Sequence, residues 1–448
     1  MKKRIVIFVL TVLLCFAFSG CQAETGETKK LWVVTDLGYD WSWGGELEMN
    51  EDRAKMDFQA MRDYFGGLPE DLEVELEVLP VNDTDLNARL TRLKTEILAG
   101  GGPDVFLLGC NYPGGGFLNR ERVFPNPEKA MYAGFFLPLD EYIENARFME
   151  WDKFTPVVME AGRSEEGQIL LPLRYNTNVL VAKKEDLGEK VPENWDEAVE
   201  GDNPVYRKGY GWAAYNDLPG VFPRVIDNKT EELLITKEEL LHRIEQGLTC
   251  PSPFADIRAE FSTLVPSQKS WVVDVWGEYN LWETDLENNV FLPLRNTEGG
   301  YTAHVTIYGA VNRNTDFPQE AFTVLDMLFS KEMQRGEAVG NMYGHGPFNL
   351  IYLFSNMSGV PVHEDLYNDK DNSVDRLTYV TEEAFQKFDK VRKEITDVYF
   401  PTDMESEIGD MYWEFFYNEV IKGEERSKNL EQAVSETYDR IWMMLGES

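Results

Sequence analysis

Cysteine and histidine are scarce in this 448-residue sequence, which contains four of each. No two cysteines have C-x-x-C spacing, and no two histidines stand at the spacing of metal ligands. These absences argue against a zinc-finger site and a disulfide-rich scaffold, which need several closely spaced ligands or cysteines. We therefore expect no metal site and no cofactor. For Cys110 and Cys250 we expect two free thiols, with a bridge between them as the alternative.

Basic residues are also scarce. The chain has 43 Lys and Arg against 79 Asp and Glu, which gives a formal net charge of −36. Such a surface repels the phosphates of nucleic acids and the headgroups of anionic lipids. The charge therefore argues against a nucleic-acid partner, whereas acidity by itself names no partner.

A long hydrophobic run is missing as well. The apolar stretch at residues 5–18 follows the basic residues "MKKR" and is too short for an ordinary membrane-spanning helix. The next residues, "FSGC" and a polar run, resemble a bacterial lipoprotein signal, although Phe18 stands where such signals usually carry an aliphatic residue. The resemblance implies a signal peptide over residues 1–20, a lipid-modified Cys21 and a tether over residues 21–30. An ordinary secretory signal cleaved nearby is the alternative.

The rest of the sequence has the composition of a globular protein, with 43% hydrophobic and 13% aromatic residues. Strand patterns occupy residues 31–34, 72–79 and 104–108. Apolar residues at helical spacing fill the two intervals between them: Ala54, Phe58, Met61 and Phe65, then Leu86, Leu90, Leu93 and Ile97. This β-α-β-α-β order predicts a parallel sheet with right-handed crossovers. Further along, a strand is expected at 306–313 and helices at 315–330, 404–422 and 428–445.

Three glycines at residues 100–102 separate the second of these helices from the third strand. A phosphate-binding loop needs the order strand, glycines, helix, so that N–H groups at the start of the helix meet the anion. Here the order is reversed, and Pro103 prevents the helix from continuing. We predict that Gly100 ends the helix in a left-handed conformation, and we reject a nucleotide-binding loop.

Six segments stand in an order that is typical of one known family. They are "LKTEILAGGGPDVFLL", "FFLPLDEYIEN", "EEGQILLPLRYNTNVLVAKKEDL", "VPENWDEAVE", "YGAVNRNTDFPQEAFTVLDMLFSKEMQ" and "VIKGEERSKNLEQAVSETYDRI". Together they cover most of residues 31–445. The sequence resembles the extracellular solute-binding proteins of ABC importers (family 1), particularly the group that binds maltodextrins and other oligosaccharides.

The resemblance implies an α/β periplasmic-binding-protein-like fold with two lobes, each a mainly parallel sheet flanked by helices, and a ligand cleft between them. Lobe one would comprise residues 31–174 and 299–344, and lobe two residues 175–298 and 345–448. The implied function is that of a monomeric, lipid-anchored receptor on the extracellular face of the bacterial cell membrane. It would bind a carbohydrate, pass it to the membrane subunits of an ABC importer, and catalyse no reaction.

Ligands of open parallel sheets bind beyond the carboxyl ends of the strands. Sugars stack on aromatic rings and form hydrogen bonds to planar carboxylates and amides. The segments after the strands therefore supply the candidate ligand-binding residues: Asp36, Tyr39, Trp41 and Trp43, and then Asn111 and Tyr112. Carried over from the family, the candidates in the rest of the chain are Arg174, Tyr175, Asn216, Asp217, Trp276, His345 and Asp410.

Some alternatives stay open on the sequence alone. Arg174 would either clamp a carboxylate or hydroxyls of the ligand, or form a salt bridge between the lobes. A secreted glycoside hydrolase with two catalytic carboxylates is a second functional class. The same receptor fold could also bind a peptide, a polyamine or another solute that is not a sugar, and the acidity of the chain favours a cationic one.

Overall fold

The computed structural model describes most of the chain after residue 28. The described residues are 29–37, 39–41, 47–49, 51–80, 83–111, 113, 120–251, 270–274, 289–335, 360–364, 389–426 and 428–447. The predicted signal peptide and Cys21 lie outside them, while Lys29 and Lys30, at the end of the predicted tether, begin the first strand. Within the described part, no helix combines the length and apolar character needed to cross a membrane.

The predicted β-α-β-α-β unit is present at the start of the described chain. Its elements are β1 (Lys29–Thr35), α2 (Glu51–Phe65), β4 (Leu72–Val78), α3 (Asp83–Leu98) and β5 (Val105–Gly109). Strand β1 pairs with β4 on one side and with β5 on the other, both in parallel. The predicted stripes on α2 and α3 pack into the core, except that Phe65 is only partly buried against it. Gly100 has the predicted left-handed backbone, with φ of 84°.

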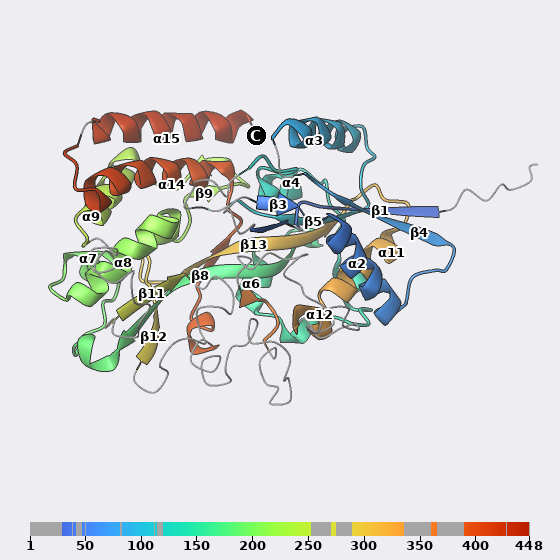
Figure 1. Cartoon of the computed structure of the whole chain (residues 1–448), viewed down its shortest axis with the longest axis horizontal. Helices are drawn as coiled ribbons and strands as arrows, with labels where there is room; N and C mark the ends of the chain where they lie inside the picture. Colours follow the sequence, from blue (N-terminus) through green and yellow to red (C-terminus); the bar gives the residue numbers. More distant parts are fainter. Residues whose placement is uncertain are drawn as a thin grey trace, which may run out of the picture.

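Two long strands connect the two halves of the molecule (Figure 1). They are β8 (Leu171–Lys183) and β13 (Thr302–Val311), which run antiparallel to each other between residues 171–177 and 303–309. Beyond Thr177, strand β8 leaves β13 and pairs with β11 (Ser270–Asp274) and β12 (Asn289–Pro293). One continuous strand therefore belongs to both halves, with the main sheet order β11-β8-β13-β5-β1-β4.

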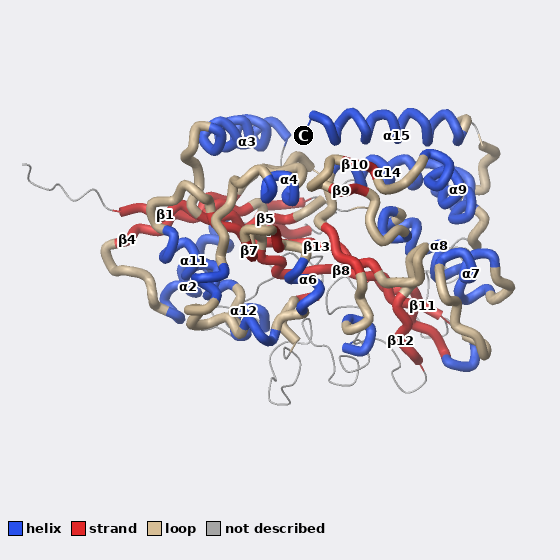
Figure 2. Tube along the Cα trace, turned by 180° about the vertical axis from the view of Figure 1, so that it is seen from behind, coloured by secondary structure: helices blue, strands red, loops and turns tan. Residues whose placement is uncertain are grey.

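Helices lie on both faces of this sheet at its first-lobe end, and beside β8, β11 and β12 at its second-lobe end (Figures 1 and 2). On the first-lobe side the remaining elements are α4 (Pro127–Tyr132), α5 (Asp140–Ile143), η1 (Trp151–Lys153), α6 (Pro156–Glu160), β6 (Arg163–Ser164), β7 (Gly167–Gln168), α11 (Pro318–Leu328) and α12 (Lys331–Arg335). The first-lobe loop after β1 contains β2 (Tyr39–Trp41) and β3 (Leu47–Met49).

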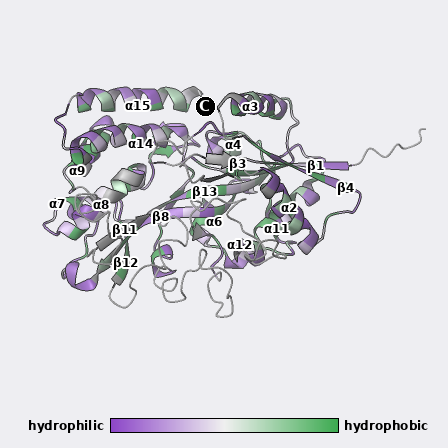
Figure 3. Cartoon of the chain, in the orientation of Figure 1, coloured by the Kyte–Doolittle hydropathy of each residue, from purple (hydrophilic) through white to green (hydrophobic). Residues whose placement is uncertain are grey.

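The second half is helical over much of its described length. Its elements are η2 (Lys184–Asp186), α7 (Trp195–Glu200), α8 (Pro204–Asp217), η3 (Pro219–Val221), β9 (Ile226–Asp227), β10 (Glu232–Leu233), α9 (Lys237–Leu248), α14 (Asp403–Phe415), the π-helix η5 (Phe416–Ile421) and α15 (Leu430–Glu447). Along the outer helices α3 and α15, hydrophilic and hydrophobic positions alternate at helical spacing (Figure 3). Most of the hydrophobic positions pack inward, whereas Leu98 of α3 and Trp442 and Met443 of α15 are exposed.

Separate hydrophobic cores mark the two lobes. The first-lobe cores take residues of β8 as far as Val179, and the second-lobe core begins at Leu180. The change of core therefore comes five residues after the boundary of 174 that we expected. The reason is that β8 pairs with β13 as far as Thr177 and pairs with β11 and β12 only beyond that residue.

The returning chain also differs from the expected division, which gave all of residues 345–448 to lobe two. Val362, Val391 and Ile395 pack in a first-lobe core. The reason is that β14 (Val360–Pro361) pairs with β8, and β15 (Asp397–Tyr399) pairs with β13, before the chain enters α14.

The expected α/β class with helix-flanked sheets is present. One detail is different: the described strand pairs of the second lobe, between β8, β11 and β12 and between β9 and β10, are all antiparallel. The parallel pairs lie in the first lobe and at the crossing β13–β15. Cys110 and Cys250 are free thiols, as expected.

Candidate functional site

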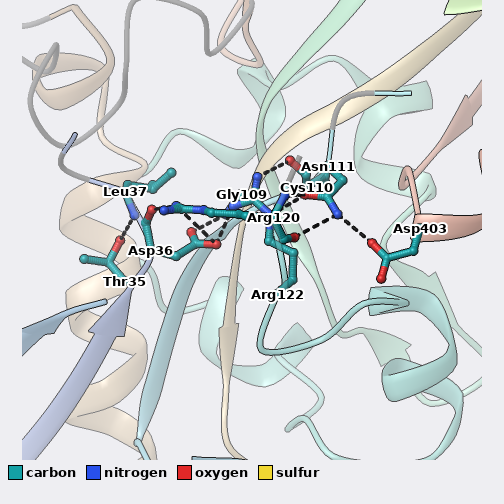
Figure 4. A network of polar contacts seen from close by, with 9 residues as sticks. All are labelled: Thr35, Asp36, Leu37, Gly109, Cys110, Asn111, Arg120, Arg122 and Asp403. Carbon is teal, nitrogen blue, oxygen red and sulfur yellow. Dashed lines mark hydrogen bonds and ion pairs between the residues drawn. The ribbon is translucent and has the colours of Figure 1, made fainter. Parts of the chain in front are cut away.

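A buried polar network lies at the carboxyl ends of β1 and β5 (the seam network: Asp36, Asn111, Arg120, Arg122 and Asp403; Figure 4). Asp36 follows β1 directly, and the N–H of Gly109 donates to its Oδ1 at 2.8 Å. Arg122 forms an ion pair with Oδ2 of Asp36, and Arg120 Nη2 lies 3.8 Å from the same oxygen. The positive charges of two guanidinium groups therefore compensate the negative charge of Asp36, which is only 3% exposed. This compensation makes the burial of the carboxylate possible.

Asn111 extends the network from the first lobe into the second. Its Oδ1 accepts a hydrogen bond from Nε of Arg122 at 2.8 Å, and its Nδ2 donates to Oδ1 of Asp403 at 2.6 Å. Asp403 is the first residue of α14 in the second lobe. The Asn111–Asp403 hydrogen bond therefore crosses between the lobes, directly beyond the end of β5.

The start of α14 buries the carboxyl group of Glu405 and partly buries that of Asp403. Thr402 and Glu405 form a capping box, in which the Thr402 N–H donates to Oε2 of Glu405 at 2.9 Å. Burial raises the pKa of Glu405 to about 7, although the hydrogen bonds from Thr402 lower it. Burial also raises the pKa of Asp403, against the opposing effect of the hydrogen bond from Asn111. The second-lobe side of the seam is therefore sensitive to protonation.

A second set of bonds joins α4 of the first lobe to the second lobe. Glu128 forms an ion pair with Arg224 and accepts a hydrogen bond from Nδ2 of Asn228. Asn126, the N-cap of α4, donates to Oδ1 of Asn228 at 2.6 Å. Lys129 donates to the carbonyl of Leu445 at 3.1 Å. In this structure the lobes are therefore in direct polar contact through two separate groups of residues.

A different polar cluster lies where α8 meets the crossing strands (the hinge network: Asp217, Gly220, His304 and Tyr399). Oδ1 of Asp217 accepts hydrogen bonds from the Tyr399 hydroxyl at 3.0 Å and the Gly220 N–H at 2.8 Å. Nδ1 of His304 lies 3.0 Å from Oδ2. His304 is on β13 and Tyr399 is on β15, so this carboxylate ties the end of α8 to two strands that pass between the lobes.

The structure brings together two of the predicted ligand-binding residues, Asp36 and Asn111, in the seam network. Arg174 is buried on β8, paired with Pro361 in β14. The structure does not support a ligand contact for Tyr175 or Asp217: Tyr175 is 0% exposed in a first-lobe core, and Asp217 belongs to the hinge network. Asp410 is outside the seam network as well, in an open groove of about 520 Å³ between α14 and α15.

For the other predicted ligand-binding residues the structure does not describe the side chains. Tyr39 and Trp41 lie on β2, which pairs with β3, and Asn216 lies in α8, but the side chains of these three are outside the described part of the chain. Trp43, Tyr112, Trp276 and His345 lie outside the described residues altogether. Their roles remain predictions.

Sequence reasoning missed most of the partners in these networks. Arg120 and Arg122 follow the glycine run at residues 114–116, and nothing in their spacing ties them to Asp36. His304 and Tyr399 have no local signature either. One signal was available: Thr402 and Glu405 have the S/T-x-x-E spacing of a capping box, which makes Thr402 the N-cap and Asp403 the first residue of α14.

Comparisons with known proteins agree with this architecture. No protein-family model matches the sequence, and no curated protein matches it. Among solved structures, the sugar-binding protein MalE from the phytopathogen Xanthomonas citri is 14% identical, with a TM-score of 0.53; the match covers 94% of this chain and 98% of that one. The extracellular solute-binding protein family 1 from Alicyclobacillus acidocaldarius is 12% identical, with a TM-score of 0.52, and the match covers 93% and 98%.

A third similar structure is the galacto-N-biose-/lacto-N-biose I-binding protein of the ABC transporter from Bifidobacterium longum, in complex with lacto-N-biose. It is 15% identical, with a TM-score of 0.50, and the match covers 94% of this chain and 98% of that one. At such low identity these similarities show the fold. The chain has the two-lobed fold of the extracellular solute-binding proteins along nearly its whole length, as its motifs predict.

Proposed function

We propose that this chain is the lipid-anchored extracellular receptor of an ABC importer, that it binds an oligosaccharide between its lobes, and that it catalyses no reaction. The three similar structures are binding proteins by their titles, and two of those titles name sugars. The receptor would close around its ligand and present the closed form to the membrane subunits of the importer.

The observation that carries this proposal is the seam network, with its hydrogen bond from Asn111 to Asp403 across the lobes. The lobes are joined by β8 and β13, so each lobe can rotate about the crossing strands. A ligand that contacts both lobes favours the closed arrangement by the difference between its affinities for the closed and open forms. The seam network lies at the strand ends where such a ligand would bind.

The chemistry of the seam network suits a polyhydroxylated ligand. It gathers a carboxylate, an amide and guanidinium groups, which are planar groups that form paired hydrogen bonds with neighbouring hydroxyls. The segment that follows Asp36 adds Tyr39, Trp41 and Trp43, whose rings would stack on sugar faces. We retain these residues, with Asn111, Tyr112, Arg174, Asn216, Trp276 and His345, as the proposed ligand contacts.

A thermal-shift screen tests the proposal. The full mature chain would be melted with neutral and acidic oligosaccharides, with spermidine and with short peptides. At least one oligosaccharide should raise the Tm, because a ligand that binds only the native state stabilises it by mass action. A shift with spermidine or a peptide and none with any sugar would refute the carbohydrate assignment. Release of reducing ends from the bound oligosaccharide would refute the absence of catalysis.

A pair of tryptophan variants tests where the ligand binds. Trp276→Ala should weaken oligosaccharide binding by about 1–3 kcal/mol, the scale of one aromatic contact. Trp442→Ala is the matched control, because Trp442 is 66% exposed on the outer helix α15. Equal affinities of the two variants would show that the predicted cleft residue is wrong, even if sugar binding itself is confirmed.

The anchor has a separate test. Expressed with its N-terminal signal in a bacterial host, the protein should fractionate with the membrane, and Cys21→Ala should release it into the soluble or secreted fraction. Membrane association that does not depend on Cys21 would contradict lipid modification at this residue and leave the carbohydrate assignment intact.

A further inference from the structure

Three side chains with metal-ligating groups meet on the second lobe, between α7 and α9. Asp196 and Glu200 are one turn apart on α7, and His242 comes from α9. One donor atom from each of the three lies within 4.8 Å of the other two. These helices stand at the far end of the second lobe from the strands β1 and β5 that carry Asp36 and Asn111 (Figure 1). The cluster therefore does not belong to the seam network.

A buried glutamine orients both carboxylates. Nε2 of Gln246 donates to Oδ1 of Asp196 at 2.7 Å and to Oε1 of Glu200 at 3.1 Å. Trp195 Nε1 in turn donates to Oε1 of Gln246 at 3.0 Å, and both Gln246 and Trp195 are buried. Such outer partners hold metal-binding carboxylates in position before the ion arrives. Here Gln246 holds one oxygen of each carboxylate in position.

The charges around the cluster favour a cation. Two of the three side chains in the cluster, Asp196 and Glu200, are carboxylates. Arg243 forms an ion pair with Oδ1 of Asp196, the same oxygen that Gln246 uses. An open groove of about 480 Å³ runs alongside Glu200 and His242, and its rim carries the acidic residues Asp202 and Glu245 with one basic residue, Arg207.

We propose that Asp196, Glu200 and His242 form a binding site for a divalent transition metal ion, with Zn²⁺ as the ion that fits best. Zn²⁺ takes imidazole nitrogen and carboxylate oxygen at about 2.0–2.2 Å, and four-coordinate sites separate their ligand atoms by about 3.3 Å. Small rotations of Glu200 and His242, both exposed, bring the three donor atoms to that spacing. The groove gives water access to the remaining coordination position.

The three ligands favour binding of Zn²⁺ over the hard cations Ca²⁺ and Mg²⁺. Ca²⁺ and Mg²⁺ take oxygen ligands and gain little from an imidazole, whereas Zn²⁺ binds imidazole readily. A bound ion would connect α7 to α9 through its ligands, and it would therefore stabilise the second lobe. This site is independent of the proposed oligosaccharide receptor function, and its failure would leave that function untouched.

Titration calorimetry and thermal melts of the tag-free protein test the proposal, with Zn²⁺, Ca²⁺ and Mg²⁺ as the probes. We expect one Zn²⁺ per chain, a Tm that rises with Zn²⁺ until the site saturates, and at least tenfold weaker binding of Ca²⁺ and Mg²⁺. His242→Ala and Glu200→Gln should each weaken Zn²⁺ binding tenfold or more. Because both residues are exposed, the metal-free melting curves of these variants should match that of the wild type.

Glu245→Gln is the matched control, since Glu245 lines the same groove from α9 but is outside the three-residue cluster. Its Zn²⁺ affinity should stay within about twofold of the wild-type value, because Glu245 supplies no ligand atom to the cluster and solvent screens its exposed charge. The proposal fails if the wild type binds no Zn²⁺ at 0.1 mM, an order-of-magnitude ceiling for a three-ligand surface site. It also fails if His242→Ala binds Zn²⁺ as the wild type does, or if Ca²⁺ binds as tightly as Zn²⁺.

Discussion

Two buried carboxylates, Asp36 and Asp217, are held in different ways. Asp36 lies at the end of β1 beside two guanidinium groups, and the network around it continues through Asn111 to Asp403 in the other lobe. Asp217 lies at the end of α8 and is held by a hydroxyl, a backbone N–H and an imidazole. One carboxylate is held by opposite charges of its own lobe beside a seam, and the other by hydrogen bonds at a hinge.

The difference matters for the lobe closure that we propose. Contacts at the seam must form and break as the lobes move, whereas contacts at the hinge must persist in both arrangements. The seam network includes one bond between the lobes, which separation would break. The hinge network ties α8 to the crossing strands β13 and β15 themselves, so it would be kept. We therefore expect substitutions at Asp217 to act mainly on stability, and substitutions at the seam to act on stability and on closure.

The largest effect is expected at the hinge. Asp217→Ala leaves the Tyr399 hydroxyl, the Gly220 N–H and His304 without their shared acceptor inside the protein. Breaking such a buried polar cluster should lower the free energy of unfolding by about 4 kcal/mol. Urea denaturation followed by circular dichroism measures it, with Asp202→Ala at an exposed position as the control. A loss below about 1 kcal/mol would show that the hinge network is not essential.

The next largest effect is expected at the seam. Arg122→Met leaves the buried Asp36 carboxylate with Arg120 and the Gly109 N–H as its partners, and should cost about 3 kcal/mol. A double-mutant cycle with Asp36→Asn should give a coupling energy of about 1–3 kcal/mol, because the two residues form one ion pair. Asp36→Asn combined with Asp217→Ala should be additive to within about 0.5 kcal/mol. Strong coupling in that second cycle would mean that seam and hinge are one unit.

A pH-dependent effect is expected from Glu405 on the second-lobe side of the seam. Its pKa in the folded protein is about 7, above the ordinary value of 4.5, so the folded protein favours the protonated form. Its contribution to stability is therefore greatest below pH 4.5 and is lost as the pH rises through 7. The shift corresponds to about 3 kcal/mol at most.

Glu405→Gln removes this titration, while its amide oxygen still accepts the hydrogen bond from Thr402. Between pH 4.5 and pH 8, the free energy of unfolding of the variant should therefore rise relative to that of the wild type, by up to about 3 kcal/mol. Denaturation of both proteins at four pH values measures this difference in the free energy of unfolding. The titrations of all other groups contribute equally to both proteins and therefore cancel. A difference that does not change with pH would contradict the raised pKa.

The smallest effect is expected in the scaffold, away from both networks. Gly100→Ala places a side chain on a residue with φ of 84°, with no other atom closer than 4.0 Å to the added Cβ, so the cost is almost wholly that of the backbone conformation. We expect a loss of about 1 kcal/mol in the free energy of unfolding. The neighbouring Gly101→Ala is the matched control and should be nearly neutral, since the added Cβ would make only an ordinary contact with the Glu96 carbonyl oxygen at 3.7 Å.

Local patterns in the sequence predict much of the first lobe. Alternation in residues 72–79, the stripe from Leu86 to Ile97, and Gly100 before Pro103 each act within one element or turn, and each element appears as predicted. The start of α11 is less accurate: the helix was expected from residue 315, but its N-cap is Phe317 and its first residue is Pro318. Helix ends depend on competing hydrogen bonds. Here the Thr315 hydroxyl donates to Asp104, the residue directly before β5, instead of capping α11.

The candidate site was much less accessible from the sequence. Asp36 and Asn111 were identified because they follow strands whose ends share one edge of a sheet. Their partners Arg122 and Asp403 are 86 and 292 residues away from them, respectively, and no local period records such a pairing. Asp217 was placed in the cleft by analogy, whereas the structure shows that the strands β13 and β15 enclose it.

The sequence by itself determined the order of strands and helices in the first lobe, the role of the glycine run and, through the order of its motifs, the two-lobed fold. Those features follow from period, propensity and backbone geometry, which act over a few residues. Only the tertiary structure decided which charges compensate one another. The sequence has no pair of histidines at the spacing of metal ligands, yet folding sets His242 beside Asp196 and Glu200. Packing of α7 against α9 creates that proximity, and packing depends on residues far apart in the chain.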